Sequence, residues 1–247
     1  SNFQRAKKVL HLELESALEG KAYVVQYLQS LTHEMKRPLA VIRSASELLT
    51  EPVPETDRQH FVASIRAQEQ RLTETIDKLL ALAEVEQHGW LQTRERIGLR
   101  RLPQAAAEAI SLRAAATGVM VDVDASAATS GDHHVLGDGF LLRQALINLL
   151  ENAIAFSPQD SCVRLHPQLR DEHWELADED RGSGVPDYAI ERVFERFYSL
   201  ALPQTGQRGS GLGLPFVGEV ARLHGGDVTP GNRDGGGAMA MLPLPIG

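Results

Sequence analysis

Between residues 3 and 88 the chain has a single glycine, Gly20, and its apolar side chains recur at helical rather than strand spacing. In the first half of this stretch they follow a 4-3-4-3 spacing, typical of the seam of a coiled coil or helical bundle. The seam positions are Val24, Leu28, Leu31, Met35, Pro38, Ile42, Ala45 and Leu49. We therefore expect long helices here.

Pro52 and Pro54 interrupt the helical pattern, because proline cannot continue a helix. Thr56 stands where it could cap a second helix, which we expect to run to about His88 and to end at Gly89. Two helices alone bury their apolar stripes poorly, so we predict that two chains pair as a four-helix bundle in a homodimer. Packing of the hairpin against the rest of its own chain is the alternative.

After residue 98 the pattern changes to alternating short helices and strands with frequent glycines. We predict helices over residues 102–116, 140–155 and 214–223, and strands over residues 119–123, 162–169, 173–177, 226–229 and 238–242. This arrangement indicates an α+β domain with one sheet. The 43% hydrophobic content supports a packed core.

The charge and cysteine content exclude several classes of function. The net charge of -8 argues against a nucleic-acid-binding protein that neutralises phosphates. The single cysteine, Cys162, fits a reducing compartment, and no apolar run approaches the roughly 18 residues of a membrane-spanning helix. We expect this fragment in the cytoplasm, cut from a longer protein.

His33 falls at an exposed heptad position, opposite the seam. On spacing alone it would be an ordinary surface histidine. The run Leu31-Thr32-His33-Glu34-Met35-Lys36-Arg37-Pro38-Leu39, however, resembles the H-box of the sensor histidine kinases of two-component systems. This resemblance implies that His33 receives the γ-phosphoryl group of ATP and that Glu34 acts as general base.

The helix predicted over residues 140–155 carries Asn148 and Asn152 in a segment that resembles the N-box of the same family. Residues four apart lie on one face of a helix, so two amides point the same way. Their oxygens suit Mg²⁺ and their NH₂ groups suit phosphates. The resemblance implies that Asn148 ligates Mg²⁺; the alternative is a pair of solvated asparagines.

Glycine-rich segments further along the chain resemble the remaining boxes of the family. Asp180, Gly182 and Gly184 match the box that holds adenine, where a carboxylate accepts the amino hydrogens of the base and glycines let the backbone approach. A second glycine box, in which backbone N–H groups before a helix cradle phosphates, comprises Gly209, Gly211, Leu212 and Gly213.

Between these glycine boxes, the segment Val193-Phe194-Glu195-Arg196-Phe197-Tyr198 resembles the family's F-box. The polar residues from Tyr198 to Arg208 are predicted to form a lid over the nucleotide. We include both end residues, Tyr198 and Arg208, among the nucleotide-binding candidates.

The resemblance spans nearly the whole chain and implies a domain plan. Residues 1–22 would be a signal-transmitting helix from a membrane or sensor region, 23–90 the dimerisation and histidine-phosphotransfer domain, 91–98 a linker, and 99–247 a GHKL (Bergerat-type) α/β sandwich that binds ATP. It also implies ATP and Mg²⁺ as cofactors, a response regulator as the phosphoryl acceptor, and a full-length protein in the bacterial inner membrane.

Four positions depart from the family pattern. Arg37 stands where a threonine or asparagine usually orients water, and arginine has no acceptor, so the resemblance does not extend to phosphatase activity on the regulator. Ala155 and Ser199 replace a common lysine and arginine, which would leave fewer phosphate contacts. Asp178 occupies a usually apolar position, and the sequence offers no reason for it.

Two other classes of function share some of these features. A catalytically weakened ATP-binding dimer could signal by docking partners, without phosphotransfer. An ATPase related to gyrase, Hsp90 and MutL would share the nucleotide boxes but would lack the helical hairpin that carries a histidine.

Overall fold

The computed structural model describes residues 25, 28–88, 90–91, 93–98, 100–124, 134–170, 173–206 and 208–246. The chain divides into two compact units, residues 1–76 and 77–247, and each is described by itself. The segment expected as a signal-transmitting helix, residues 1–22, lies outside the described residues, as does Val24 of the predicted seam.

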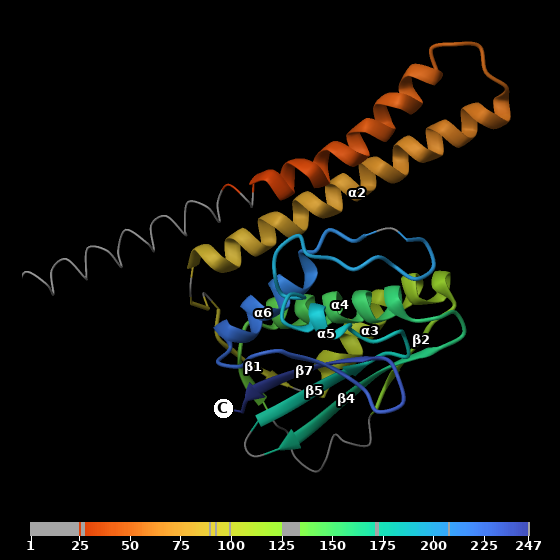
Figure 1. The fold of residues 1–247 in the computed structure, drawn as a ribbon. Coiled ribbons are helices and arrows are strands. Elements are labelled where there is room, and N and C mark those ends of the chain that lie inside the picture. Colours follow the sequence, from red (N-terminus) through yellow and green to blue (C-terminus); the bar gives the residue numbers. More distant parts are fainter. Residues whose placement is uncertain are drawn as a thin grey trace, which may run out of the picture. The chain divides into compact units, whose positions relative to one another are not determined.

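The first unit is a helical hairpin, as the spacing predicts (Figure 1). One helix covers residues 28–48, and the other is α2, Glu55–His88, which continues into the second unit. Most seam residues are shielded from solvent: Pro38 and Ala45 are buried, and Leu31, Met35, Ile42 and Leu49 are half-buried. Leu28, which is 53% exposed, is the exception.

The start of α2 differs from the sequence prediction. The backbone N–H of Arg58 donates to the carbonyl of Pro54 (2.9 Å), so Pro54 precedes the first turn and Thr56 lies inside it. The predicted threonine cap is therefore wrong. Glu55 and Asp57 place negative charge in the first turn instead, where it interacts favourably with the helix dipole.

The second unit is a layer of helices on a mixed sheet (Figure 1). Its five-stranded sheet has the order β2-β4-β5-β7-β6, and β2 and β4 are its parallel pair. In chain order the elements after α2 are β1 (Glu95–Gly98), α3 (Arg101–Thr117), β2 (Met120–Val123), β3 (His134–Gly137), α4 (Gly139–Phe156), β4 (Cys162–Arg170), β5 (His173–Glu179), α5 (Asp187–Ile190), α6 (Gly213–Leu223), β6 (Thr229–Asn232) and β7 (Ala238–Pro245).

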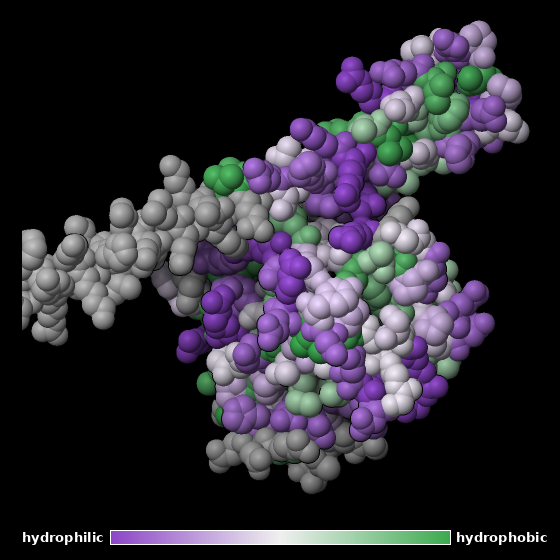
Figure 2. Space-filling model, in the orientation of Figure 1, coloured by the Kyte–Doolittle hydropathy of each residue, from purple (hydrophilic) through white to green (hydrophobic). Residues whose placement is uncertain are grey.

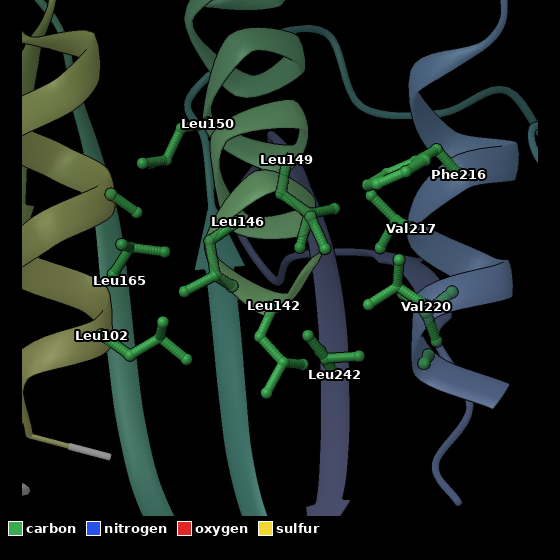
Figure 3. Packing of buried hydrophobic residues seen from close by; sticks show 14 of the residues in the cluster. Leu102, Leu142, Leu146, Leu149, Leu150, Leu165, Phe216, Val217, Val220 and Leu242 are labelled. Atoms are coloured by element: carbon green, nitrogen blue, oxygen red, sulfur yellow. The ribbon is translucent and has the colours of Figure 1, made fainter. Parts of the chain in front are cut away.

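The core lies between the sheet and α3, α4 and α6. Leu142, Leu146 and Leu149 project from α4 into this core (Figure 3), and each is at most 1% exposed. Burying a leucine side chain contributes about 1.5–3 kcal/mol, so α4 anchors the unit. The helix is thereby held with its C-terminal half, which carries the two asparagines, beside the cavity described below.

Two predictions about the second unit need correction. β1 pairs with β3 in a separate two-stranded sheet, so the prediction of one sheet is wrong. Both strands have only four residues, too few to show a period. The strand expected at 226–229 is β6, which begins at Thr229, because the chain turns at Gly225 (φ +74°) after α6.

His224, just after α6, fixes the entry of α4. Its Nδ1–H donates to the carbonyl of Val220 (2.7 Å), and its Nε2 accepts the backbone N–H of Asp138 (3.0 Å). A Cβ at Gly137 would lie 2.3 Å from the imidazole, so only glycine fits there. Asp138 in turn caps α4 by accepting the backbone N–H of Leu141 (3.0 Å).

We expect the free energy of unfolding to fall as pH is lowered below about 6.5 and part of this fall to come from His224. Burial lowers the pKa of His224, so the unfolded chain takes up its proton at a higher pH than the folded chain does, and acid favours unfolding. Urea titrations between pH 7.5 and 5.0 measure this. In His224→Gln the dependence on pH should be weaker; an equal dependence in both proteins would contradict the assignment.

Candidate functional site

A cavity of about 240 Å³ opens in the second unit beside the C-terminal half of α4. Its wall combines α4, the ends of β5 and β7, and the loop segments before α5 and α6. Eight of the predicted nucleotide-binding residues line it: Asn148, Asn152, Asp180, Gly184, Tyr198, Gly209, Gly211 and Gly213. The fold thus brings into one cavity residues that lie up to 65 positions apart in the chain, from 148 to 213.

Asn148 presents an oxygen that lacks a protein partner. Its side chain is 3% exposed, and Nδ2 donates to the carbonyl of Gln144 (3.0 Å). In the part of the chain that the structure describes, Oδ1 is buried without a hydrogen-bond partner. Leaving such an atom unpaired costs about 1–3 kcal/mol, which points to a ligand that the oxygen contacts.

Gly213 leaves room in front of the two amides. A Cβ at this position would lie 3.1 Å from Asn148 Oδ1 and 3.6 Å from Asn152 Nδ2. Because glycine has no Cβ, the amide oxygen of Asn148 and the amide NH₂ of Asn152 lie directly next to the first turn of α6. The first turn of a helix offers unpaired backbone N–H groups, so the arrangement suits an anion together with a cation.

Asp180 is held rigidly at the end of β5. Its Oδ1 accepts the backbone N–H groups of Gly182 (2.8 Å) and Ala238 (2.9 Å), so Oδ2 remains for a ligand. Burial raises the pKa of Asp180, and the two backbone hydrogen bonds act in the opposite direction. The carboxyl is thus a fixed acceptor, 6% exposed, at the wall of the cavity.

The F-box and the second glycine box pack directly against each other. The backbone N–H of Phe197 donates to the carbonyl of Gly211 (2.9 Å), and a Cβ at Gly211 would lie 2.6 Å from the backbone of Phe197 and Tyr198. Gly211 has φ +65°, a conformation that favours glycine. The Arg192 guanidinium covers the Tyr198 ring at 4.3 Å. The aromatic segment therefore fixes the glycine loop at the cavity.

Three predicted binding residues are not part of the cavity lining. Gly182 donates its N–H to Asp180, and a Cβ there would lie 2.5 Å from the Phe156 carbonyl, so it shapes the wall from behind. Leu212 is fully buried in the core. Arg208 is exposed. Its backbone forms an antiparallel bridge with Ala201, within the segment predicted as a lid.

Asp178 is a cavity residue that sequence reasoning noticed but could not explain. It precedes Asp180 by two positions on β5, and alternate residues of a strand face the same side. Its side chain is 4% exposed, and burial, then Asp180, then Glu179 raise its pKa to about 8. The strand alternation was the signal that could have placed it in the site.

The first unit carries His33 and Glu34 on the helix over residues 28–48. His33 is exposed, as its heptad position predicts. The Glu34 side chain is 16% exposed, and its Oε1 lies 3.5 Å from Arg37 Nη1, one turn further on. The histidine is therefore accessible to a reactant, and the neighbouring carboxylate is held on the helix surface.

Known proteins define the class of each unit. Residues 137–247 match the family described as "Histidine kinase-, DNA gyrase B-, and HSP90-like ATPase", and residues 24–88 match the "His Kinase A (phospho-acceptor) domain". The cavity is thus that of an ATP-binding domain, preceded by a phospho-acceptor hairpin. The chain belongs to the sensor histidine kinases.

The chain is 42% identical over 232 residues to the sensor protein CreC of Escherichia coli, covering 92% of this chain and 46% of that protein. In sequence, the segments Glu19–Val24, Gly182–Ala189 and Phe194–Leu200 suggest a likeness to CreC, and the likeness of the chain as a whole is confirmed. A second relative, the sensor-like histidine kinase SenX3 of Mycolicibacterium smegmatis, is 30% identical, covering 89% of this chain and 56% of its own length. The chain thus spans about half the length of these relatives.

Solved structures agree on the fold. Full-length ShkA in complex with AMPPNP superposes with a TM-score of 0.63 at 26% identity, over 90% of this chain and 46% of that one. Histidine kinase ThkA in complex with the response regulator TrrA gives a TM-score of 0.71 at 17% identity, over 92% of this chain and 63% of ThkA. The predicted fold class, a helical hairpin followed by a GHKL sandwich, is confirmed.

Within the residues that the structure describes, no helix is both long and apolar enough to cross a bilayer.

Proposed function

We propose that the protein is an ATP-dependent protein-histidine kinase whose second unit binds ATP and whose His33 receives the γ-phosphoryl group. The observation that carries this proposal is the cavity, where the unpaired Asn148 oxygen, the fixed Asp180 carboxyl and the glycine loop before α6 meet. It is supported by the match of the hairpin to a phospho-acceptor family and by the nucleotide analogue bound to ShkA.

In this proposal an imidazole nitrogen of His33 attacks the γ-phosphorus while the bond to the ADP oxygen breaks. Glu34 accepts a hydrogen bond or the proton from the other ring nitrogen, which keeps the attacking nitrogen nucleophilic. The exposure of His33 lets a nucleotide or a regulator reach it. The remaining catalysis is positioning and neutralisation of charge around the phosphates.

The residues present fit Mg²⁺. Asn148 Oδ1 is a hard oxygen ligand that otherwise lacks a partner among the described residues. We assign Asn148 as the protein ligand, with Asn152 beside it to contact phosphate. When bound with ATP, the ion would neutralise charge on the phosphate oxygens. Tyr198, Gly184, Gly209, Gly211 and Gly213 complete the nucleotide-binding lining, with Gly182 and Leu212 shaping it and Arg208 as a further candidate for phosphate contact.

We further propose a homodimer. The first unit exposes large apolar side chains that a second hairpin would cover: Val25, Leu28, Leu39, Val41, Leu48, Val62 and Ile76, each 37–53% exposed. Figure 2 shows hydrophobic surface (green) on the hairpin, interrupted by hydrophilic residues. A four-helix bundle formed by two chains would bury such stripes.

The proposed acceptor of the phosphoryl group is an aspartate of a CreB-like response regulator, supported by the likeness to CreC and by the regulator bound to ThkA. We propose the domain plan given above for the sequence, with the phosphotransfer domain at 23–90 and the catalytic domain from 99 onward. The full-length protein would lie in the inner membrane with this portion on the cytoplasmic side, as a sensor related to CreC would require.

The proposal is tested by incubating the protein with γ-labelled ATP and Mg²⁺. We expect label on the protein that is labile in acid and stable in base, as a phosphoramidate is, and that is lost when EDTA removes the metal. Addition of a cognate regulator should move the label onto the regulator. Release of phosphate without label on the protein would favour a simple ATPase instead, and binding of ATP without either product would favour a docking module.

A further inference from the structure

The nucleotide cavity holds a second carboxyl, Asp178, for which the proposed kinase chemistry gives no role. Asp178 lies on the same face of β5 as Asp180, and both residues line the cavity. Among the residues that the structure describes, its Oδ1 is buried without a hydrogen-bond partner. A buried polar atom that faces a cavity and lacks a protein partner points to a bond with the ligand.

The neighbours of Asp178 within the sheet are apolar. Leu165 on β4 and Ala240 on β7 stand opposite it in the two strand pairings. Neither side chain can donate a hydrogen bond or balance a charge. The position is therefore costly for a carboxylate, and burial accordingly raises the pKa of Asp178 to about 8.

The charged groups around Asp178 either raise its pKa further or are already paired with one another. Glu179 on the same strand and Asp180 just after its end are acids, and both favour the neutral form of Asp178. The Glu179 carboxylate pairs with Arg233 Nε (3.0 Å) and lies 3.7 Å from His166 Nε2. Arg233 also donates through Nη1 to the backbone carbonyl of Asp180 (2.9 Å).

The facing helix, α4, adds no unpaired cation near Asp178 among the described residues that line the cavity. Its cavity residues Asn148 and Asn152 are neutral, and Glu151 is engaged by Lys78 (2.8 Å) and Arg113 (2.7 Å). At pH 7 the Asp178 carboxyl is therefore protonated. It offers an O–H donor, whereas Asp180 offers an acceptor.

A donor beside an acceptor matches one edge of adenine. Adenine has an exocyclic amino group, which donates, next to ring nitrogens, which accept. We propose that Asp178 is a second base-reading residue, whose carboxyl donates a hydrogen bond to a ring nitrogen of the adenine while Asp180 accepts from the amino group. This inference rests on the proposed function, because it presumes that the cavity binds an adenine nucleotide.

The test is the affinity for ADP, measured by calorimetry between pH 7.0 and 9.5 on the wild type, Asp178→Asn and Asp178→Val. The wild type should bind more weakly as pH rises through about 8, because the carboxyl loses its donor proton. Asparagine keeps an N–H donor and has no proton to lose, so Asp178→Asn should bind equally across this range. Asp178→Val should bind about tenfold more weakly than the wild type at pH 7.

Deaza analogues of ADP identify the ring nitrogen. Replacement of N1 or N7 by CH should weaken binding to the wild type for one of the two analogues, and that loss should be absent in Asp178→Val. Thermal unfolding of the variants controls for the fold, since valine suits an apolar site.

Two outcomes overturn the inference: a wild-type pH profile as flat as that of Asp178→Asn, or unchanged ADP affinity in a folded Asp178→Val. If the wild type binds no adenine nucleotide at any pH, the proposed function itself fails, which is a different result.

Discussion

His33→Gln should abolish labelling of the protein by γ-labelled ATP, leaving less than about 1% of the wild-type signal. Glutamine has no nucleophilic nitrogen that could carry the phosphoryl group, so the reaction loses its acceptor rather than a contributor to its rate. The side chain is exposed on a helix, so the exchange should leave the fold and the binding of nucleotide unchanged. Gel-based phosphorylation and ADP calorimetry on the same sample measure both quantities.

His60 provides a matched control for this experiment. It also is an exposed histidine on the hairpin, on α2 instead of the first helix. His60→Gln should therefore accept label at the wild-type rate. Acid-labile label that persists in His33→Gln would show that another histidine is the acceptor and would refute the assignment.

Asp180→Asn should weaken the binding of ADP by roughly 30- to 150-fold, which corresponds to about 2–3 kcal/mol for a lost hydrogen bond to a charged group. Asparagine is isosteric, and its Oδ1 can still accept the N–H groups of Gly182 and Ala238. This requirement fixes the amide orientation and turns Nδ2 toward the ligand. An acceptor thus becomes a donor that faces the amino group of the base.

Asp187→Asn is the control for the loss of one negative charge near this site. Asp187 is exposed in the first turn of α5, only seven positions from Asp180. We expect its variant to bind ADP as the wild type does. If Asp180→Asn remained folded and bound ADP with unchanged affinity, the adenine would have to be recognised elsewhere in the cavity.

Most helices were predictable because their apolar periodicity is long. The helices expected over residues 102–116, 140–155 and 214–223 appear as α3, α4 and α6 within a residue or so of each end. The two-stranded sheet was missed because β1 and β3 have four residues each, and short strands show no period. The start of α2 was misplaced because a threonine after two prolines can either cap a helix or lie inside its first turn, and the sequence pattern is the same in both cases.

Candidate site residues were found by their place in motifs, and the structure explains several of them individually. A Cβ at Gly211 would collide with the Phe197 backbone, and a Cβ at Gly213 would crowd the Asn148 amide at 3.1 Å. These contacts join segments that are distant in sequence, so they cannot be predicted from the spacing of the glycines. Gly182 and Leu212 belong to the same motifs but stand behind the cavity, a distinction that depends on which way each residue faces.

The sequence by itself determined the helical hairpin, the order of the nucleotide boxes and the exposed heptad position of His33, because each of these depends on local periodicity or on a short motif. Only the tertiary structure decided the role of Asp178 and the state of its proton. Its environment consists of Leu165 and Ala240 on the neighbouring strands and of the facing helix α4, and the fold brings these together around it. Burial and the loss of solvation that follows are properties of this three-dimensional surrounding.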